Sequence, residues 1–210
     1  MRIFGLAFFL FISGSALALS VRVQVVDVGQ ADGIVIRTPN KNNWIVIDAG
    51  IGEKFAKYLV EMGVNKLDMA VVTHRHKDHQ HGMPRVIEKI PIDLFVGVTE
   101  DCPNRIGDDK VREKIVLKQV TVHTLSSTPK ILTIDGVTFT ILPLPSTLAK
   151  CPDDENLNSI VVRMDYGDFS MLFTGDAEEE TLDWLVQNHS DLLDVDVLKA
   201  SHLCRLYIAL

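Results

Sequence analysis

The stretch Thr73-His74-Arg75-His76-Lys77-Asp78-His79 places three histidines and an aspartate in the pattern H-x-H-x-D-H. Residues 67–72, just upstream, form a short apolar run that is typical of a strand. Downstream, Gly82 and Pro84 precede a helical pattern that reaches Ile90. We therefore expect the four side chains on a strand-to-helix loop, where they can converge on one point. Because neutral imidazoles and carboxylates are ligands for zinc and similar ions, the stretch predicts a metal site.

Length, hydrophobic content and net charge limit the size of the core and the kind of substrate. The chain has 210 residues, 47% of them hydrophobic, which is enough for one sizeable core and about one domain. The formal net charge is −7, whereas general nucleic-acid binders carry a basic surface. A polyanionic substrate would therefore have to be held locally, by bound metal or by a small basic patch.

Residues 1–18 have the pattern of a signal peptide. Arg2 supplies the positive charge, residues 3–12 the apolar run, and Ala16-Leu17-Ala18 the cleavage pattern. We expect export to the periplasm or the extracellular space, a mature domain over 19–210, and no stable membrane partner after cleavage. An uncleaved N-terminal anchor is the alternative.

Export also changes how the cysteines are interpreted, because disulfides persist in oxidising compartments. Cys102 and Cys151 each stand beside a proline in loop-like sequence, so a bridge between them is one prediction. Cys204, near the end of the chain, is left without an obvious counterpart.

Apolar runs and turn residues divide the chain into two strand-rich halves. Together with their helices, these halves favour an α+β sandwich of two mixed sheets, with helices outside. A polar loop is expected over 143–158. The strands are expected at 21–28, 33–38, 44–48, 67–73, 93–98, 120–125, 130–134, 137–142, 159–166, 169–173 and 195–200, and the helices at 53–62, 82–90, 109–119 and 177–188.

Two further candidate ligands stand where predicted strands end. Asp176 follows Thr174-Gly175 after an apolar strand, and His202 follows the strand over 195–200. Each has an ordinary structural alternative, Asp176 as the N-cap of a helix and His202 as a surface histidine. The nearby H-x-H-x-D-H pattern favours the metal-binding interpretation of both.

These motifs together resemble the metallo-β-lactamase superfamily. The resemblance rests on H-x-H-x-D-H after a strand, on Thr174-Gly175-Asp176, and on the stretch Leu198-Lys199-Ala200-Ser201-His202. It extends from about Val21 to His202 and implies the four-layer αββα sandwich of that superfamily. The chain further resembles the branch that contains the hydrolase domain of ComEC-type DNA-uptake proteins. The branch motifs are Asp27-Val28-Gly29-Gln30-Ala31-Asp32, Asn158-Ser159 before a strand, and Tyr166-Gly167-Asp168-Phe169.

The resemblance implies two divalent metal ions, with zinc expected and manganese as the alternative. Asp48 matches the aspartate that supports the metal loop from a neighbouring strand end, and Asp78 and Asp176 are the predicted catalytic carboxylates. The implied ligands are His74 and His76 for the first ion, Asp78, His79 and His202 for the second, and Asp176 as a bridge between them.

Two departures from the superfamily pattern affect these expectations. Many members have a further histidine for the first ion, where this chain reads Asn156-Leu157-Asn158-Ser159. Asn158 is the candidate for that position. The branch usually continues after the last histidine with His-Gly-Ser, a strand and a helix, whereas residues 203–210 differ from that continuation. A truncated C-terminus is therefore expected.

The function implied is that of an exported metal-dependent hydrolase, a phosphodiesterase or nuclease acting through a metal-bound hydroxide. Its substrate would be a small-molecule or nucleic-acid phosphodiester, and no protein partner is predicted. A β-lactam or lactone hydrolase is the first alternative. An inactive, truncated metal-binding remnant is the second.

Overall fold

The computed structural model describes residues 20–40, 42–97, 108–123, 125, 127–143, 154–201 and 205–208. The predictions for the signal peptide, for Cys102, Cys151 and Cys204, and for His202 concern residues outside the described ranges. Within those ranges, no helix combines the length and the apolar character needed to cross a membrane.

The N-terminal half builds the first of two mixed sheets. Its strands lie in the order β1-β2-β3-β4-β5-β6, so neighbours in the sheet are also neighbours in the sequence. The pairs β1–β2 and β2–β3 are antiparallel, and the pairs from β3 to β6 are parallel. The strands are β1 (Arg22–Val25), β2 (Gly33–Arg37), β3 (Trp44–Ala49), β4 (Leu67–Val71), β5 (Ile92–Val96) and β6 (Thr121–His123).

The C-terminal half builds the second sheet, in the order β12-β11-β10-β9-β8-β7. Only the pair β10–β11 is parallel. Asp135 and Gly136 both have positive φ, at 52° and 77°, which is the backbone of a tight hairpin turn between β7 and β8. The strands are β7 (Lys130–Ile134), β8 (Val137–Ile141), β9 (Val162–Tyr166), β10 (Phe169–Phe173), β11 (Val197–Ala200) and β12 (Arg205–Ile208).

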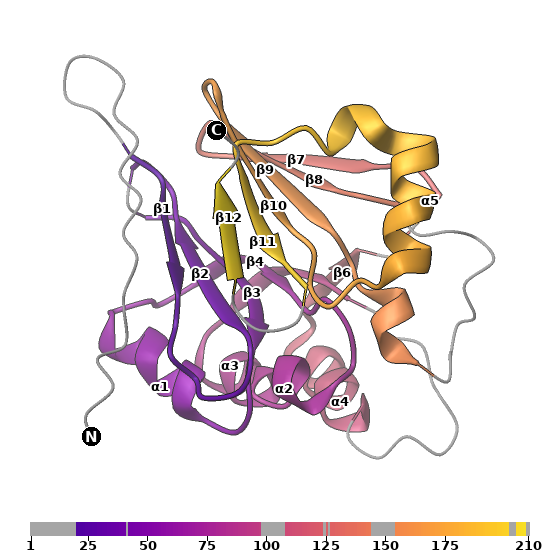
Figure 1. Ribbon diagram of the computed structural model, residues 1–210. Coiled ribbons are helices and arrows are strands. Elements are labelled where there is room, and N and C mark those ends of the chain that lie inside the picture. Colours follow the sequence, from indigo (N-terminus) through magenta and orange to yellow (C-terminus); the bar gives the residue numbers. More distant parts are fainter. Residues whose placement is uncertain are drawn as a thin grey trace, which may run out of the picture.

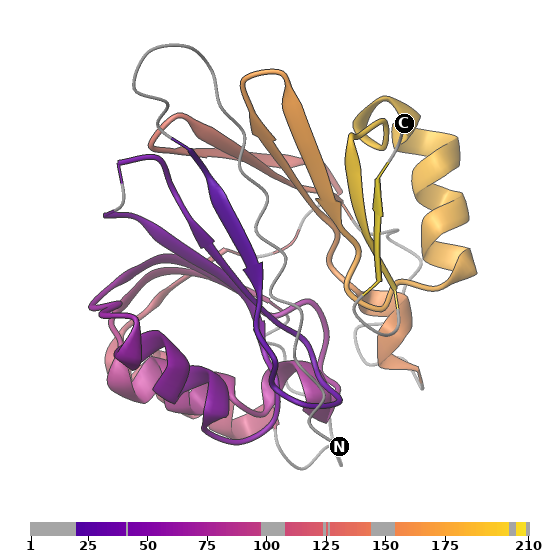
Figure 2. The ribbon, with the colours of Figure 1, turned by 60° about the vertical axis from the view of Figure 1, so that its left-hand side comes forward.

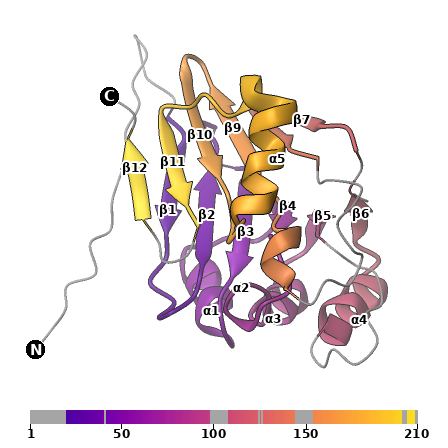
Figure 3. The ribbon, with the colours of Figure 1, turned by 45° about the vertical axis from the view of Figure 1, so that its right-hand side comes forward.

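Helices cover the outer face of each sheet (Figures 1 and 2). On the first sheet lie α1, α3 and α4, which share one apolar cluster with its strands. On the second sheet lies α5, in the foreground of Figure 3, where Leu185 packs on Val161 and Leu172. The helices are α1 (Lys54–Glu61), α2 (Lys77–Gln80), α3 (Met83–Lys89), α4 (Asp108–Lys118) and α5 (Glu179–His189), with 3₁₀ turns η1 (Glu155–Asn158) and η2 (Ser190–Leu192).

The two sheets face each other across a second apolar cluster. In β3, Ile45 and Ile47 belong to this inter-sheet core, while Val46 belongs to the cluster under the helices. Alternate side chains of a strand point to opposite faces, so a strand buried on both sides is apolar throughout. Each such isoleucine contributes roughly 1.5–3 kcal/mol by leaving water. The four layers therefore depend on strands with two apolar faces.

The predicted α+β class and αββα sandwich are confirmed. Three local predictions are wrong. Asp78 and His79 lie on the short helix α2 and not on an open loop. The expected loop over 143–158 contains η1. Helix α5 begins at Glu179 and not at residue 177 as expected; its N-cap is Glu178, which also excludes the alternative of Asp176 as that cap.

The end of the chain adds a strand that the sequence patterns did not predict. Arg205–Ile208, whose sequence differs from the family's usual continuation, form β12, an antiparallel partner of β11. A strand with a free edge can pair with any extended segment that lies beside it, since the backbone supplies the hydrogen bonds whatever the side chains are.

Candidate metal centre

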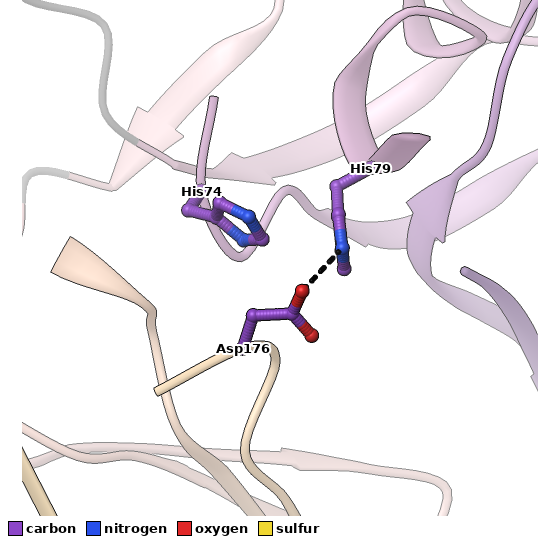
Figure 4. Close-up of side chains that lie close together, drawn as sticks. All are labelled: His74, His79 and Asp176. Carbon is purple, nitrogen blue, oxygen red and sulfur yellow. Dashed lines mark hydrogen bonds and ion pairs between the residues drawn. The ribbon is translucent and has the colours of Figure 1, made fainter. Parts of the chain in front are cut away.

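The two sheets bring metal-capable side chains together at one end of the sandwich. His74 and His76 follow β4 of the first sheet, and α2 carries His79. Asp176 comes from the second sheet, in the turn after β10. Figure 4 shows the side chains of His74, His79 and Asp176 pointing into a common space, with Asp176 on the tan segment that belongs to the C-terminal half.

Distances within the cluster are short. The His79 Nε2 atom lies 3.2 Å from Asp176 Oδ2, and the rings of His74 and His79 are 4.0 Å apart between centroids. His74 Nε2 lies 3.1 Å from His76 Nδ1. The ligand atoms of His74, His79 and Asp176 all lie within 4.8 Å of one another, and the three residues are buried.

Asp48 fixes both the Thr73 backbone and the ring of His79. Its Oδ1 accepts a hydrogen bond from the Thr73 amide at 2.8 Å, and its Oδ2 accepts from the Thr73 hydroxyl at 2.7 Å. The same Oδ2 lies 2.8 Å from His79 Nδ1, which leaves Nε2 directed at Asp176. Asp48 has a φ of 58°, a conformation that aspartate tolerates better than most residues. A carboxylate that fixes the ring of a metal-binding histidine raises its basicity as a ligand.

Burial and charge set the protonation of the two histidines. Burial lowers the pKa of His74 to about 3, so its imidazole is neutral near pH 7. Burial also acts to lower the pKa of His79, but the carboxylates of Asp48 and Asp176 outweigh it and raise that pKa to about 10. Burial opposes ionisation of Asp48, yet His79 beside it brings the pKa of Asp48 below its usual range.

These residues fit a divalent metal ion by the chemistry of their donors. Two buried carboxylates flank His79, so the cluster stabilises positive charge at that point. A neutral imidazole from His74 completes a nitrogen and oxygen donor set of the kind that zinc prefers. We infer that a cation is the natural occupant of the space between these side chains.

The other predicted site residues lie at varying distances from this cluster. His76 is partly buried and contacts the His74 ring. The Asp78 side chain is 43% exposed, and its Oδ2 lies 3.9 Å from His79 Nε2, farther out than Asp176. Asn158 is buried at the end of η1, beside Ser159, whose hydroxyl accepts a hydrogen bond from the Asp176 amide at 3.2 Å. His202 lies outside the described residues.

Two buried residues beside the cluster, Asp32 and Lys199, were given no individual role by the sequence. Asp32, Asp48 and His79 form another set of close ligand atoms, and Lys199 Nζ is bonded to Asp32 Oδ2. A lysine at an inward position of the apolar run over 195–200 was the signal that could have pointed to it. Because the side-chain period of a strand is two, Lys199 shares the inward face of Val197.

Gly175 provides a test of how closely the two sheets approach at this site. It has a φ of 54°, and a Cβ there would lie 2.7 Å from the Thr73 Cβ. Gly167 has a similar φ of 60°, but nothing lies within 4 Å of its added Cβ. Both glycine-to-alanine changes incur the left-handed backbone cost of roughly 1–2 kcal/mol.

Only Gly175→Ala should also push Thr73 and Asp176 apart, which adds about 1–3 kcal/mol of overpacking. Urea unfolding and zinc titration of both variants check this. We expect Gly175→Ala to lose more stability than Gly167→Ala and to bind zinc more weakly. Equal losses of stability with equal zinc affinity would contradict the close approach.

Comparison with known proteins supports the architecture and the family. Residues 43–202 match the family described as "Beta-lactamase superfamily domain". ComE operon protein 3 of Bacillus subtilis (strain 168) is 26% identical over 199 residues, which cover 86% of this chain and 25% of that protein. The chain thus spans about a quarter of the length of this curated relative. The predicted resemblance to the DNA-uptake branch is confirmed.

Solved structures share the fold at low sequence identity. ETHE1 from Myxococcus xanthus superposes with a TM-score of 0.57 at 16% identity, covering 90% of this chain and 79% of that one. A metallo-beta-lactamase from Pontibacter korlensis gives 0.54 at 16% identity, covering 96% and 94% of the two chains. These likenesses show that the sandwich is that of the metallo-beta-lactamase fold.

Proposed function

The chain belongs to the Beta-lactamase superfamily, and from this premise we propose that it is a metal-dependent hydrolase that cleaves phosphodiester bonds. The observation that carries the proposal is the 3.2 Å approach of His79 Nε2, on α2 of the N-terminal half, to Asp176 Oδ2, in the turn after β10, beside His74. These side chains are buried, and Asp48 orients the His79 ring through Nδ1, as carboxylates commonly do for metal-binding histidines.

We propose that His74, His76, Asp78, His79, Asp176 and His202 hold two divalent ions, with zinc preferred. When bound, such ions supply Lewis acidity and lower the pKa of water toward about 7. The chain's own contribution is orientation. His74 offers a neutral nitrogen, Asp48 fixes the His79 ring through Nδ1, and Ser159 holds the Asp176 backbone.

The choice of substrate rests on the branch. The match to ComE operon protein 3 and the motifs shared with the DNA-uptake branch support a phosphodiester, such as single-stranded DNA or a small diester. The segment Asn156-Leu157-Asn158-Ser159 has no histidine, which argues against the ligand set of many superfamily members. Export and a mature domain over 19–210 belong to the same proposal.

Three substrates and one matched pair of variants test the assignment. Purified protein is incubated with zinc or manganese and offered single-stranded DNA, bis(p-nitrophenyl) phosphate or a chromogenic cephalosporin. We expect cleavage of the DNA and of the phosphodiester, loss of activity with a chelator, and recovery with zinc or manganese. His76→Ala should lose the activity, whereas His81→Ala, an exposed neighbour, should keep it.

The alternatives give different results. Turnover of the cephalosporin alone would replace phosphodiester hydrolysis with β-lactam hydrolysis. Tight zinc binding without turnover of any of the three substrates would mark the protein as an inactive metal-binding remnant. Failure to bind zinc or manganese would refute the metal centre itself.

A further inference from the structure

Lys199 and Asp32 form an ion pair inside the sandwich. Lys199 is 1% exposed and Asp32 is 6% exposed, and Lys199 Nζ donates to Asp32 Oδ2. The pair crosses from one sheet to the other, because Asp32 directly precedes β2 and Lys199 lies on β11. The Lys199 ammonium is held by Asp32 inside the sandwich, so we consider what the pair does for the segments bonded to it.

The backbone of each partner is bonded to a segment that carries a candidate metal ligand. The Asp32 amide donates to the carbonyl of Asp78, on α2, at 3.0 Å. The Lys199 carbonyl accepts from the Thr174 hydroxyl at 2.9 Å, two residues before Asp176. A continuous chain of contacts therefore runs from α2 through Asp32 and Lys199 to the turn that holds Asp176.

These contacts join the same two segments, α2 and the turn of Asp176, that the contact between His79 and Asp176 also joins. The ion pair therefore constrains the separation of these two segments. In the group of Asp32, Asp48 and His79, the Lys199 ammonium already lies beside Asp32 and would repel a second cation.

We propose that Asp32 and Lys199 are positioning residues that set the separation between the α2 ligands and Asp176. This inference rests on the proposed metal centre and adds a determinant of its geometry. Apolar residues of similar volume can replace a buried ion pair with little loss of stability, whereas removal of one partner leaves the other charge buried and alone. The pair is therefore expected to matter more for the geometry of the centre than for the stability of the fold.

The double variant Asp32→Val/Lys199→Met separates these two roles. The matched control is Lys66→Met/Asp93→Val, which removes an exposed pair whose Nζ and Oδ2 atoms lie 2.6 Å apart. Thermal unfolding reports stability, zinc titration reports affinity, and the absorption spectrum of the Co²⁺-loaded protein reports the geometry of the ligands.

We expect the double variant to melt near the wild-type temperature, and the single variant Lys199→Met to melt lower. Zinc affinity of the double variant should fall by about 10–100-fold, as for other residues that orient metal ligands, and its Co²⁺ spectrum should change. The control pair should alter neither zinc affinity nor the spectrum.

Wild-type zinc affinity and an unchanged Co²⁺ spectrum in the double variant would overturn the inference. A double variant that melts far below the wild type would also overturn it, because the pair would then support the fold itself. If the wild-type protein bound no zinc, the metal centre would fail first, and that outcome is visible before any variant is made.

Discussion

Asp176→Asn should abolish hydrolysis while leaving the fold intact. The change keeps the shape of the side chain and removes its charge, so His79 Nε2 loses the carboxylate that now lies 3.2 Å away. Bound metal ions contribute several kcal/mol of charge stabilisation in the transition state, and each 1.36 kcal/mol is tenfold in rate, so kcat/KM should fall by about 10³-fold or more. Kinetics with bis(p-nitrophenyl) phosphate and the zinc content of the purified protein measure the effect.

Asp168→Asn is the matched control for this change. Asp168 lies in the exposed turn between β9 and β10, on the same hairpin that leads to Asp176. The control removes the same charge without touching the cluster, so activity and zinc content should stay at wild-type values. Full activity in Asp176→Asn, or an equal loss in both variants, would contradict the role given to Asp176.

Phe173→Ala should produce the largest loss of stability. Phe173 is fully buried in the inter-sheet core at the end of β10, beside Val162 of β9. Removal of a buried phenyl ring typically costs about 3–5 kcal/mol, from lost burial and from the cavity that remains. Total stabilities are only about 5–15 kcal/mol, so this is a large fraction. Urea unfolding at a fixed temperature measures the loss directly.

Val186→Ala provides the comparison for that loss. Val186 lies on α5 and is 56% exposed, so its truncation should change the free energy of unfolding by no more than about 0.5 kcal/mol. If both variants lost the same stability, Phe173 could not lie in a closed core between two sheets. The packing of the two sheets described above would then be wrong, and so would the contact between Asp176 and His79.

Much of the fold follows from local patterns. Alternating or continuous apolar runs predicted the strands from β1 to β11, and the two residues left between the runs over 159–166 and 169–173 match the tight hairpin of β9 and β10. The short helix α2 was missed because Lys77–Gln80 is too short and too polar to show helical periodicity. The 3₁₀ turn η1 was missed for the same reason.

The sequence by itself determined which residues can bind metal and which segments are strands or helices. Both properties depend on side-chain chemistry and on neighbours a few positions away. The family resemblance implied that His79 and Asp176, 97 positions apart, share a metal ion, and the tertiary structure places them in contact. Only the tertiary structure decided that Asp32 meets Lys199, 167 positions later. Such meetings depend on how two sheets stack and on the exclusion of water between them, and no local pattern encodes the direction in which one sheet faces the other.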